Sequence, residues 1–408
     1  MKSVVIAGAG QAAAWVARTL RSEGFAGQLV MCGAESVPPY ERPPLSKEQL
    51  VPGAADMAYL IRPEEFSALG VEWRAATHVE RIDRAARAVE LSSGEWLKYD
   101  ALVIATGGRA HIPPIPGFDR DCVHTLRTLD DARRLRDRLL PGRRVLVVGG
   151  GWIGLEVAAA AVRRGAAVTL VEMGSNLCAR SGVQDLSTYL HDLHVSNGVQ
   201  VRLNTRVVRL DTHAEGSYTA EFDDGSSYVA DVVVVGAGLV PNSDMAIQAG
   251  LDCDRGILVD ATGRSSDPCI FAAGDVAVLR TADGRGERLE SWQNAQDQGI
   301  AVAQSLMGKP TRYEPLPFFW STQYDELIQM TGTAHGVAEW LMRPGGSGTQ
   351  QTHLGLNGSG KVVFGLCINA PRDIRVLRRS IAEAASLDRS RFADSAVPLA
   401  RAVVAAAG

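Results

Sequence analysis

The strongest constraint on the fold of this chain is a glycine-rich turn that occurs twice. The first copy spans Gly8–Ala13 and the second spans Gly149–Gly154. Each follows a run of β-forming residues and precedes an alanine-rich segment of helical character. In a strand–turn–helix of this kind, backbone N–H groups and the positive end of the helix face a pyrophosphate, and a Cβ atom would block its approach. One such turn also serves ordinary packing, but two in the same context predict two dinucleotides on one polypeptide.

The bulk properties indicate a globular enzyme with more than one domain. A chain of 408 residues is too long for a single hydrophobic core. A net charge of -4 creates no global field that would favour nucleic acid or an anionic membrane, so we expect neither as a partner. The apolar run at residues 4–7 is too short for a signal peptide, and no apolar run has the length of about 18 residues that a transmembrane helix needs. We therefore expect a soluble, cytoplasmic protein.

The cysteines predict neither a metal site nor disulfides. They are scattered, with no C-x-x-C pair and no metal-ligand spacing, which is typical of reduced thiols in a cytoplasmic protein. The six positions are Cys32, Cys122, Cys178, Cys253, Cys269 and Cys367.

Strand and helix patterns alternate in two blocks and then change character. The first block predicts strands at 4–7, 28–32, 101–105 and 270–273 and helices at 12–22 and 293–307. The second predicts strands at 144–148, 167–171 and 232–235 and a helix at 153–164. After about Leu316 we expect strands at 326–331 and 361–369 and two closing helices rich in arginine and alanine.

These patterns predict an α/β fold with two Rossmann-like dinucleotide-binding domains and a C-terminal α+β domain. The predicted boundaries are residues 1–110 with 241–316 for a discontinuous first domain, 111–240 for the second and 317–408 for the third.

The second turn has the features of an NAD site. Gly149, Gly151 and Gly154 complete the G-x-G-x-x-G pattern, and Glu172 follows the next strand. An acid at this position accepts hydrogen bonds from the ribose 2′-OH of NAD and repels the 2′-phosphate of NADP. No arginine follows Glu172 directly, so the pattern favours NAD, and the alternative for Glu172 is a solvated charge at the end of a strand.

The first turn is less specific. Ala13 occupies the third glycine position, and Glu35 follows the next strand either as a ribose ligand or as a surface charge. The turn alone does not distinguish FAD from NAD.

Further motifs run in order over nearly the whole chain. They are Tyr40–Lys47, Leu126–Ala132, Gly149–Glu156, Gly236–Asn242, Ala273–Asp275, Glu290–Ala295 and Phe318–Ser321. In these motifs the chain resembles the two-dinucleotide-binding flavoprotein reductases, and within them the ferredoxin reductases that serve aromatic-ring dioxygenases and bacterial cytochrome P450 systems.

The resemblance implies FAD at the first turn and NADH at the second. The FAD contacts that it implies are Gly8, Gly10, Ala12, Ala13, Glu35, Arg42, Lys47, Val79, Thr106, Arg127, Asp275 and Trp292. The NAD contacts are Gly149, Gly151, Ile153, Gly154, Glu172, Gly236 and Glu290. Trp292 is expected at the start of a helix, whose dipole stabilises negative charge on the reduced flavin.

The resemblance also implies the route of the electrons. Disulfide reductases of this fold carry redox-active cysteine in the segment that corresponds to residues 40–47, and this chain has none there. Disulfide chemistry is therefore excluded, and the electrons are expected to leave singly for a 2Fe-2S ferredoxin that supplies an oxygenase.

Three residues are the candidates for catalysis. Lys47, expected on a helix that begins after Pro44, and Glu156 are implied to meet beside the flavin, where hydride transfer needs positioning more than acid–base chemistry. The alternatives are a surface lysine and an ordinary helix charge. Trp320 is either part of an electron route to the acceptor or a core aromatic.

The last candidate site is a cluster of arginines on a predicted helix. Arg372, Arg375 and Arg379 share one helical face, with Arg378 beside them. This face is either solvated or a docking patch for an acidic ferredoxin. Rubredoxin, a quinone or oxygen remain alternative acceptors, and a structural role like that of apoptosis-inducing factor is the alternative of another class. The oligomeric state stays open.

Overall fold

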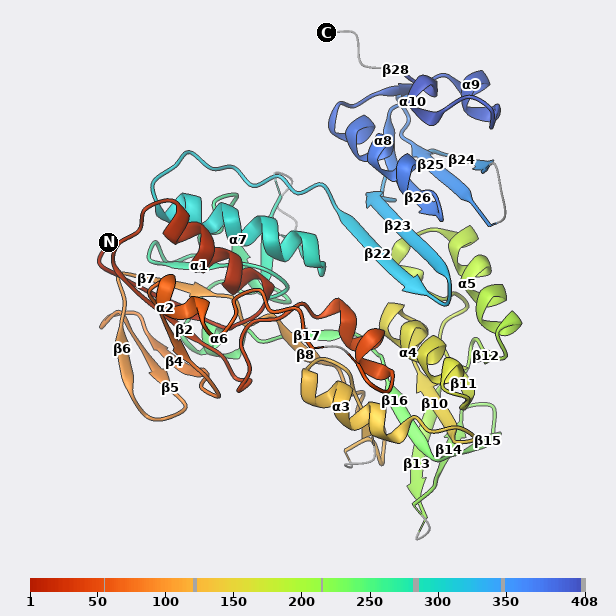
Figure 1. Cartoon of the computed structure of the whole chain (residues 1–408), viewed down its shortest axis with the longest axis horizontal. Helices are drawn as coiled ribbons and strands as arrows, with labels where there is room; N and C mark the ends of the chain where they lie inside the picture. The colour runs from red at the N-terminus through yellow and green to blue at the C-terminus, as the bar shows by residue number, and fades with distance from the viewer. Residues whose placement is uncertain (55, 120–122, 214–215, 282–285, 346–348, 405–408) are drawn as a thin grey trace. The chain divides into compact units, whose positions relative to one another are not determined.

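The computed structural model describes residues 1–54, 56–119, 123–213, 216–281, 286–345 and 349–404. Cys122 lies outside this described part. The chain forms two compact units that interleave along the sequence (Figure 1). Unit 1 comprises Met1–Pro44, Ala55–Arg109 and Leu239–Pro315, and unit 2 comprises Leu45–Ala54, Ala110–Gly238 and Leu316–Gly408.

Unit 1 is built on a five-stranded parallel sheet of order β19-β7-β1-β2-β3. Its strands are β1 (Ser3–Ala7), β2 (Gln28–Cys32), β3 (Val71–Arg74), β7 (Ala101–Ile104) and β19 (Ile270–Ala272). Successive residues of β1 belong to two different cores, because both faces of the sheet are covered: Val4 and Ile6 pack on one side, Val5 and Ala7 on the other.

Two helices cover one face of this sheet. α1 (Gln11–Ser22) and α7 (Trp292–Leu306) lie side by side, although they are far apart in sequence (Figure 1). Their close approach depends on Gly299, where a Cβ atom would lie 2.7 Å from the carbonyl oxygen of Ala12.

The other face of the sheet packs against smaller elements. The remaining elements of this part of the chain are α2 (Glu65–Ala68), α6 (Asp244–Gln248), β4 (Val79–Asp83), β5 (Ala88–Leu91), β6 (Trp96–Lys98), β8 (Gly108–Ala110), β17 (Leu239–Pro241), β18 (Ile257–Val259), β20 (Ala277–Arg280) and β21 (Gly286–Glu287).

Unit 2 contains a second five-stranded parallel sheet, of order β12-β11-β10-β16-β9. Its strands are β9 (Val123–His124), β10 (Arg144–Val148), β11 (Ala167–Val171), β12 (Gln200–Arg202) and β16 (Val232–Val235). The accompanying elements are α3 (Leu129–Arg138), α4 (Trp152–Arg163), α5 (Gln184–Ser196), the turns η2 (Glu48–Leu50) and η3 (Ala179–Ser181), and the meander β13 (Val207–Thr212), β14 (Tyr218–Phe222) and β15 (Ser227–Ala230).

The C-terminal part of unit 2 is an antiparallel sheet of order β22-β23-β26-β25-β24. Its strands are β22 (Phe318–Gln323), β23 (Glu326–Gly332), β24 (Glu339–Pro344), β25 (Gln351–Leu356) and β26 (Val362–Ile368). The chain continues through α8 (Pro371–Ala382), β27 (Ser386–Leu387), α9 (Arg389–Ala393), α10 (Leu399–Ala402) and β28 (Val403–Val404).

The predicted α/β class with two Rossmann-like parallel sheets and a C-terminal α+β part is confirmed. The expectation of two closing helices was wrong, since the described residues form α8, α9 and α10 there. The last two are single-turn elements, too short for a periodic pattern to reveal. The division of unit 2 into a nucleotide-binding domain and a C-terminal domain stays a prediction.

The packing of α1 on α7 can be tested with Gly299→Ala. Alanine is better than glycine in an exposed helix by about 1 kcal/mol. Here the added methyl group must separate two packed helices, so we expect a net loss of about 1–3 kcal/mol and a lower melting temperature. Gln304→Ala in the same helix is the control and should change little. An unchanged or higher melting temperature for Gly299→Ala would mean that the helices do not pack this closely.

Candidate functional site

The first glycine turn, in unit 1, bends tightly at its first glycine and leaves open space at its second. Gly8 has a φ of +118°, and a Cβ atom on it would lie 2.2 Å from the carbonyl oxygen of Ala105. Gly10 is the N-cap of α1, and a Cβ atom on it would meet nothing within 4 Å. Ala13 is fully buried in the core beneath the turn. The first glycine therefore shapes the turn, and the second leaves space in front of a helix N-terminus.

The second turn, in unit 2, repeats this arrangement. Gly149 has a φ of +107°, and a Cβ atom on it would lie 2.6 Å from the carbonyl oxygen of Gly236. Gly151 is the N-cap of α4, and its Cβ atom would meet only that same oxygen, at 3.9 Å. Gly154 allows α4 to lie against the turn, because its Cβ atom would be 2.0 Å from the carbonyl oxygen of Gly149.

Both turns fit the pyrophosphate of a dinucleotide. Gly10 and Gly151 are the N-caps of their helices, and no protein atom lies closer than 3.9 Å to the position of a Cβ atom on either. The first N–H groups of each helix have no partner within the helix and, with the helix dipole, attract an anion.

Glu172 is held at the second turn by main-chain donors. Its Oε2 accepts the N–H of Gly150 at 2.7 Å, and its Oε1 accepts the N–H of Gly174 at 2.8 Å. Each carboxylate oxygen can accept a second hydrogen bond, so this geometry leaves acceptor capacity for a ribose hydroxyl. The structure thus places Glu172 directly beside the turn, as its spacing predicts.

Glu35 and Arg42, both assigned to the first site, meet in unit 1. The guanidinium of Arg42 lies 2.8 Å from Glu35 Oε1, and the hydroxyl of Tyr40 donates to Oε2 at 2.7 Å. The Arg42 guanidinium also lies over the ring of Tyr40, 5.2 Å from its centre. Glu35 is therefore a fixed, half-buried acid rather than a freely solvated surface charge.

The other residues expected near FAD lie around the carboxyl ends of the unit 1 strands. Thr106, just after β7, donates its hydroxyl to the Asn242 carbonyl at 2.9 Å. Asp275 follows β19, where the preceding Gly274 N–H donates to the buried Gln298 of α7. Trp292 is the first residue of α7, so its predicted position at the start of a helix is confirmed.

Four further candidates have particular settings. The side chain of Val79 is buried, so a contact with a cofactor would have to involve its main chain. Arg127 precedes α3 and donates its N–H to Asp131 at 3.1 Å. Ile153 is exposed on the first turn of α4. Glu290 lies in unit 1, 2.7 Å from the guanidinium of Arg288.

Lys47 and Glu156 form a buried ion pair within unit 2. The ammonium of Lys47 lies 2.8 Å from Glu156 Oε2, and Glu156 on α4 is only 5% exposed. The expectation that Lys47 lies on a helix was wrong. It separates two short 3-10 turns, η1 (Pro43–Ser46) and η2. The backbone of Lys47 has a φ of -126° and a ψ of -99°, outside the helical region, so the two turns do not join into one helix.

Two serines complete the environment of Glu156, and sequence reasoning missed both roles. Ser46 donates its hydroxyl to Oε2, and Ser321 of β22 donates to Oε1 at 2.6 Å. A buried carboxylate is stabilised only when its lone pairs are met by donors. Both serines lie in the recognised motifs, but the motifs do not tell which side chains converge on one carboxylate.

The thiol of Cys178 also lies near this acid. Burial raises the pKa of Cys178, and the negative charges of Glu156 and Glu172 raise it further. Cys178 therefore stays a protonated thiol at neutral pH and cannot act as a nucleophile.

Trp320 lies on the face of β22 opposite to Ser321, the residue that contacts Glu156, because successive side chains of a strand alternate between its two faces. Ser321 points to α4, and its neighbour Phe319 packs against Trp152 with ring centres 4.8 Å apart. Trp320 stacks on Phe318 instead, with ring centres 6.0 Å apart.

The arginines of α8 divide into two groups. Arg372, Arg375 and Arg379 are exposed. Arg378 is half-buried, and its guanidinium lies 4.7 Å from the ring centre of Phe318. Arg379 also pairs with Glu383 at 2.7 Å.

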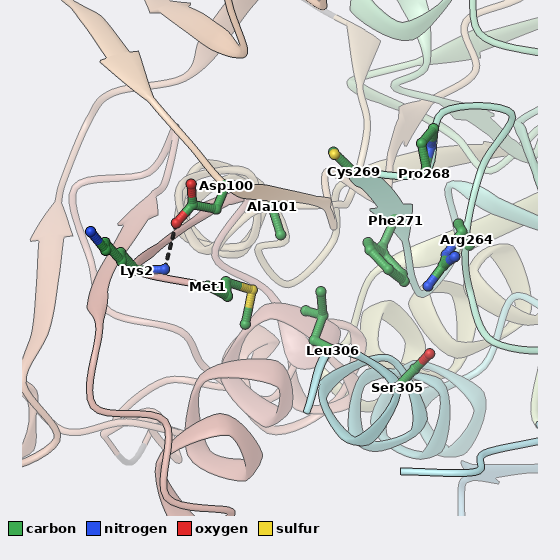
Figure 2. A pocket seen from close by; sticks show the side chains of 10 residues that line it. All are labelled: Met1, Lys2, Asp100, Ala101, Arg264, Pro268, Cys269, Phe271, Ser305 and Leu306. Carbon is green, nitrogen blue, oxygen red and sulfur yellow. Dashed lines mark hydrogen bonds between the residues drawn. The ribbon is translucent and has the colours of Figure 1, made fainter. Parts of the chain in front are cut away.

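A pocket of about 550 Å³ in unit 1 lies away from the glycine turn. Lys2, Asp100 and Cys269, which line it, each come just before a strand of the parallel sheet (Figure 2). The main-chain N–H of Lys2 donates to the Asp100 carboxylate at its rim. The pocket is thus at the amino ends of the strands, whereas ligands of such sheets bind at the carboxyl ends.

Among the described residues, no group of three or more His, Cys, Asp or Glu side chains is placed to hold a metal ion. Five cysteines in the same part of the chain are free thiols. No helix within the described ranges is both long enough and apolar enough to span a membrane.

The chain is similar to known proteins over nearly its whole length. The family model described as pyridine nucleotide-disulphide oxidoreductase matches residues 2–299, and the model described as reductase C-terminal matches residues 318–403. The ferredoxin–NAD(+) reductase component of an anthranilate 1,2-dioxygenase system from Burkholderia cepacia is 40% identical over 397 residues, which cover 97% of this chain and 98% of that protein.

Two solved structures have the same fold. The putidaredoxin reductase–putidaredoxin covalent complex contains a chain of 34% identity with a TM-score of 0.92, and the match covers 98% of this chain and 97% of that one. The ferredoxin reductase for the CYP199A2 system from Rhodopseudomonas palustris is 32% identical with a TM-score of 0.92, covering 99% of this chain and 100% of that one. The resemblance carried by the sequence motifs is therefore confirmed.

The separate roles of two glycines in the second turn can be tested by a matched pair of substitutions. Gly154→Ala forces a Cβ atom against the turn, so we expect a lower melting temperature. Gly151→Ala meets no protein atom closely, so we expect unchanged stability but an NAD+ dissociation constant raised at least about tenfold, because the pyrophosphate loses its approach to the N–H groups. Thermal unfolding and calorimetric titration of the holoenzyme measure both effects. Unimpaired NAD+ binding by Gly151→Ala would remove this turn from the site.

Proposed function

The chain belongs to the pyridine nucleotide-disulphide oxidoreductase family, and on that premise we propose that it is an NADH-dependent ferredoxin reductase. It takes a hydride from NADH onto FAD and passes the electrons singly to a 2Fe-2S ferredoxin that supplies an oxygenase. The observation that carries this proposal is the whole-chain similarity to the reductase component of the anthranilate 1,2-dioxygenase system.

FAD and NAD(H) are the cofactors, and each has its own glycine turn. We assign FAD to Gly8–Ala13 in unit 1, with Glu35, Arg42, Asp275 and Trp292 as further contacts. We assign NADH to Gly149–Gly154 in unit 2, with Glu172 on the ribose. When bound, FAD supplies the chemistry that the side chains lack, since a flavin accepts a hydride and releases single electrons.

The absence of cysteine from Tyr40–Lys47 supports single-electron output. A disulfide reductase needs a thiol to relay electrons from its flavin, and this segment offers Lys47 in a buried ion pair instead. The free cysteines of the described residues also support a cytoplasmic location.

We assign Lys47 and Glu156 to the hydride-transfer step. Lys47 polarises the flavin, and Glu156 holds the ammonium in position through the 2.8 Å ion pair. On the acceptor side we assign Trp320 to the electron route and the exposed arginines of α8 to ferredoxin docking.

The role of Lys47 is tested by Lys47→Ala. We expect anaerobic flavin reduction by NADH to slow by about tenfold or more, since hydride transfer depends on positioning and the substitution leaves the buried Glu156 charge without its cation. Stopped-flow absorbance measures the rate, with the exposed Lys98→Ala as control. A rate equal to that of the wild type would remove Lys47 from the mechanism.

The docking patch is tested by the double variant Arg375→Glu/Arg379→Glu. We expect a higher apparent KM for 2Fe-2S ferredoxin and a weaker dependence of turnover on salt, because the complementary charge is lost. The control is Arg206→Glu/Arg209→Glu, which makes the same change of net charge on another exposed surface. Equal KM values for the two double variants would refute the patch. Turnover with rubredoxin, a quinone or oxygen but not with ferredoxin would overturn the acceptor itself.

A further inference from the structure

The Lys47–Glu156 pair is the end of a longer hydrogen-bonded series inside unit 2. Beyond Glu156, Ser321 Oγ lies 3.1 Å from Gln323 Nε2. Gln323 Oε1 lies 2.9 Å from His194 Nε2, and His194 Nδ1 lies 3.1 Å from the hydroxyl of Tyr324. The series thus connects three elements: β22 with its following turn, α5 and α4.

Every hydrogen bond in the series donates toward Glu156. A carboxylate only accepts, so Ser321 must use its single hydroxyl hydrogen on Oε1. Its oxygen therefore accepts from the Gln323 amide N–H, which turns the Gln323 carbonyl to His194. That carbonyl requires a proton on His194 Nε2, and the neutral ring then accepts the Tyr324 hydroxyl at Nδ1.

The members of the series are excluded from water. Ser321 and His194 are 0% exposed, and Gln323 is 1% exposed. Burial lowers the pKa of His194, against the opposing effect of its hydrogen bond to Gln323, which agrees with the neutral imidazole that the geometry requires. In such surroundings a donor or acceptor left without a partner is destabilising, so the series holds together as a unit.

The backbone conformation of Tyr324 is an independent observation that points to a functional role for the series. It occupies the two-residue loop between β22 and β23 with a φ of +53°. A bulky residue rarely adopts this left-handed conformation, and glycine or asparagine would adopt it without strain. The loop therefore retains an unfavourable residue whose hydroxyl and ring both engage His194, with ring centres 5.2 Å apart.

We propose that Ser321, Gln323 and His194 are positioning residues for hydride transfer, which act through Glu156. Their aligned donors fix the orientation of the Glu156 carboxylate, so that Oε2 stays directed at Lys47. The inference rests on the proposed role of Lys47 and Glu156, and it extends that role to a strand in the C-terminal part of the chain.

The first test is a double-mutant cycle on the holoenzyme. Gln323→Leu places a somewhat shorter, apolar side chain at this buried position and removes both hydrogen bonds. We expect it to slow anaerobic flavin reduction by NADH by about tenfold, with an unchanged dissociation constant for NADH. In a Glu156→Gln background the same substitution should change the rate by less than about twofold, because the group through which it acts is absent. Thr322→Val, at an exposed position of the same strand, is the control.

The second test does not depend on activity. In protein labelled with 15N-histidine, the nitrogen shifts of His194 report its tautomer, and the signal is assigned by its loss in His194→Gln. We expect the neutral Nε2–H form at neutral pH in the wild type and a different tautomer mixture in Gln323→Leu. Ser321→Ala replaces Gln323→Leu in both tests if the latter fails to fold.

The outcomes separate this inference from the proposed function. The role of the series would be refuted if Gln323→Leu slowed flavin reduction equally in the wild-type and Glu156→Gln backgrounds. It would also be refuted if Glu156→Gln slowed the reaction and Gln323→Leu did not. Either result would leave the role of Glu156 intact. A protonated or Nδ1–H His194 in the wild type would also overturn the role of the series. A normal rate for Glu156→Gln would instead refute the proposed function of the pair.

Discussion

The buried carboxylate of Glu156 is the constraint on which the organisation of unit 2 depends. A charge removed from water must be met by donors, and here they come from segments far apart in sequence: Ser46 and Lys47 before the parallel sheet, and Ser321 after it. This explains why residues 45–54 belong to unit 2 although the chain on both sides belongs to unit 1. Arg164 adds a further tie, with its guanidinium 2.5 Å from the carbonyl oxygen of Leu50.

The two glycine turns have the same geometry but differ in whether a methyl group fits at the third position. Each begins with a glycine of positive φ that approaches a neighbouring carbonyl, and each has an open glycine at the helix N-cap. They differ at the third position, where Gly154 is forced by contact with Gly149 and the first turn accepts Ala13. Packing distance between helix and turn, rather than the ligand, decides whether a methyl group is allowed there.

Much of the fold could be predicted from the sequence, because buried parallel strands are continuous apolar runs and their helices have glycine at the start. β2, β10, β11 and β16 have the predicted bounds. Local pattern failed at Lys47, where a non-helical backbone conformation separates two 3-10 turns in place of one helix. It also could not reveal Ser46 and Ser321, since a serine is common in any sequence, and its role depends on which tertiary neighbour it faces. The candidate site was therefore predictable as a set of motifs but not as a network.

The alternation of β22 has a consequence for how this chain can change. Ser321 and Gln323 face α4 and α5, whereas Phe318 and Trp320 lie on the other side with Arg378. Inserting or deleting one residue in this strand would exchange the two sets at once. Tyr324, which has a left-handed backbone conformation in the two-residue loop, fixes the register of β22 against β23. Substitutions can accumulate on either face separately, but the number of residues in β22 and its loop is constrained. Alignments of related chains should therefore have no gap in this segment.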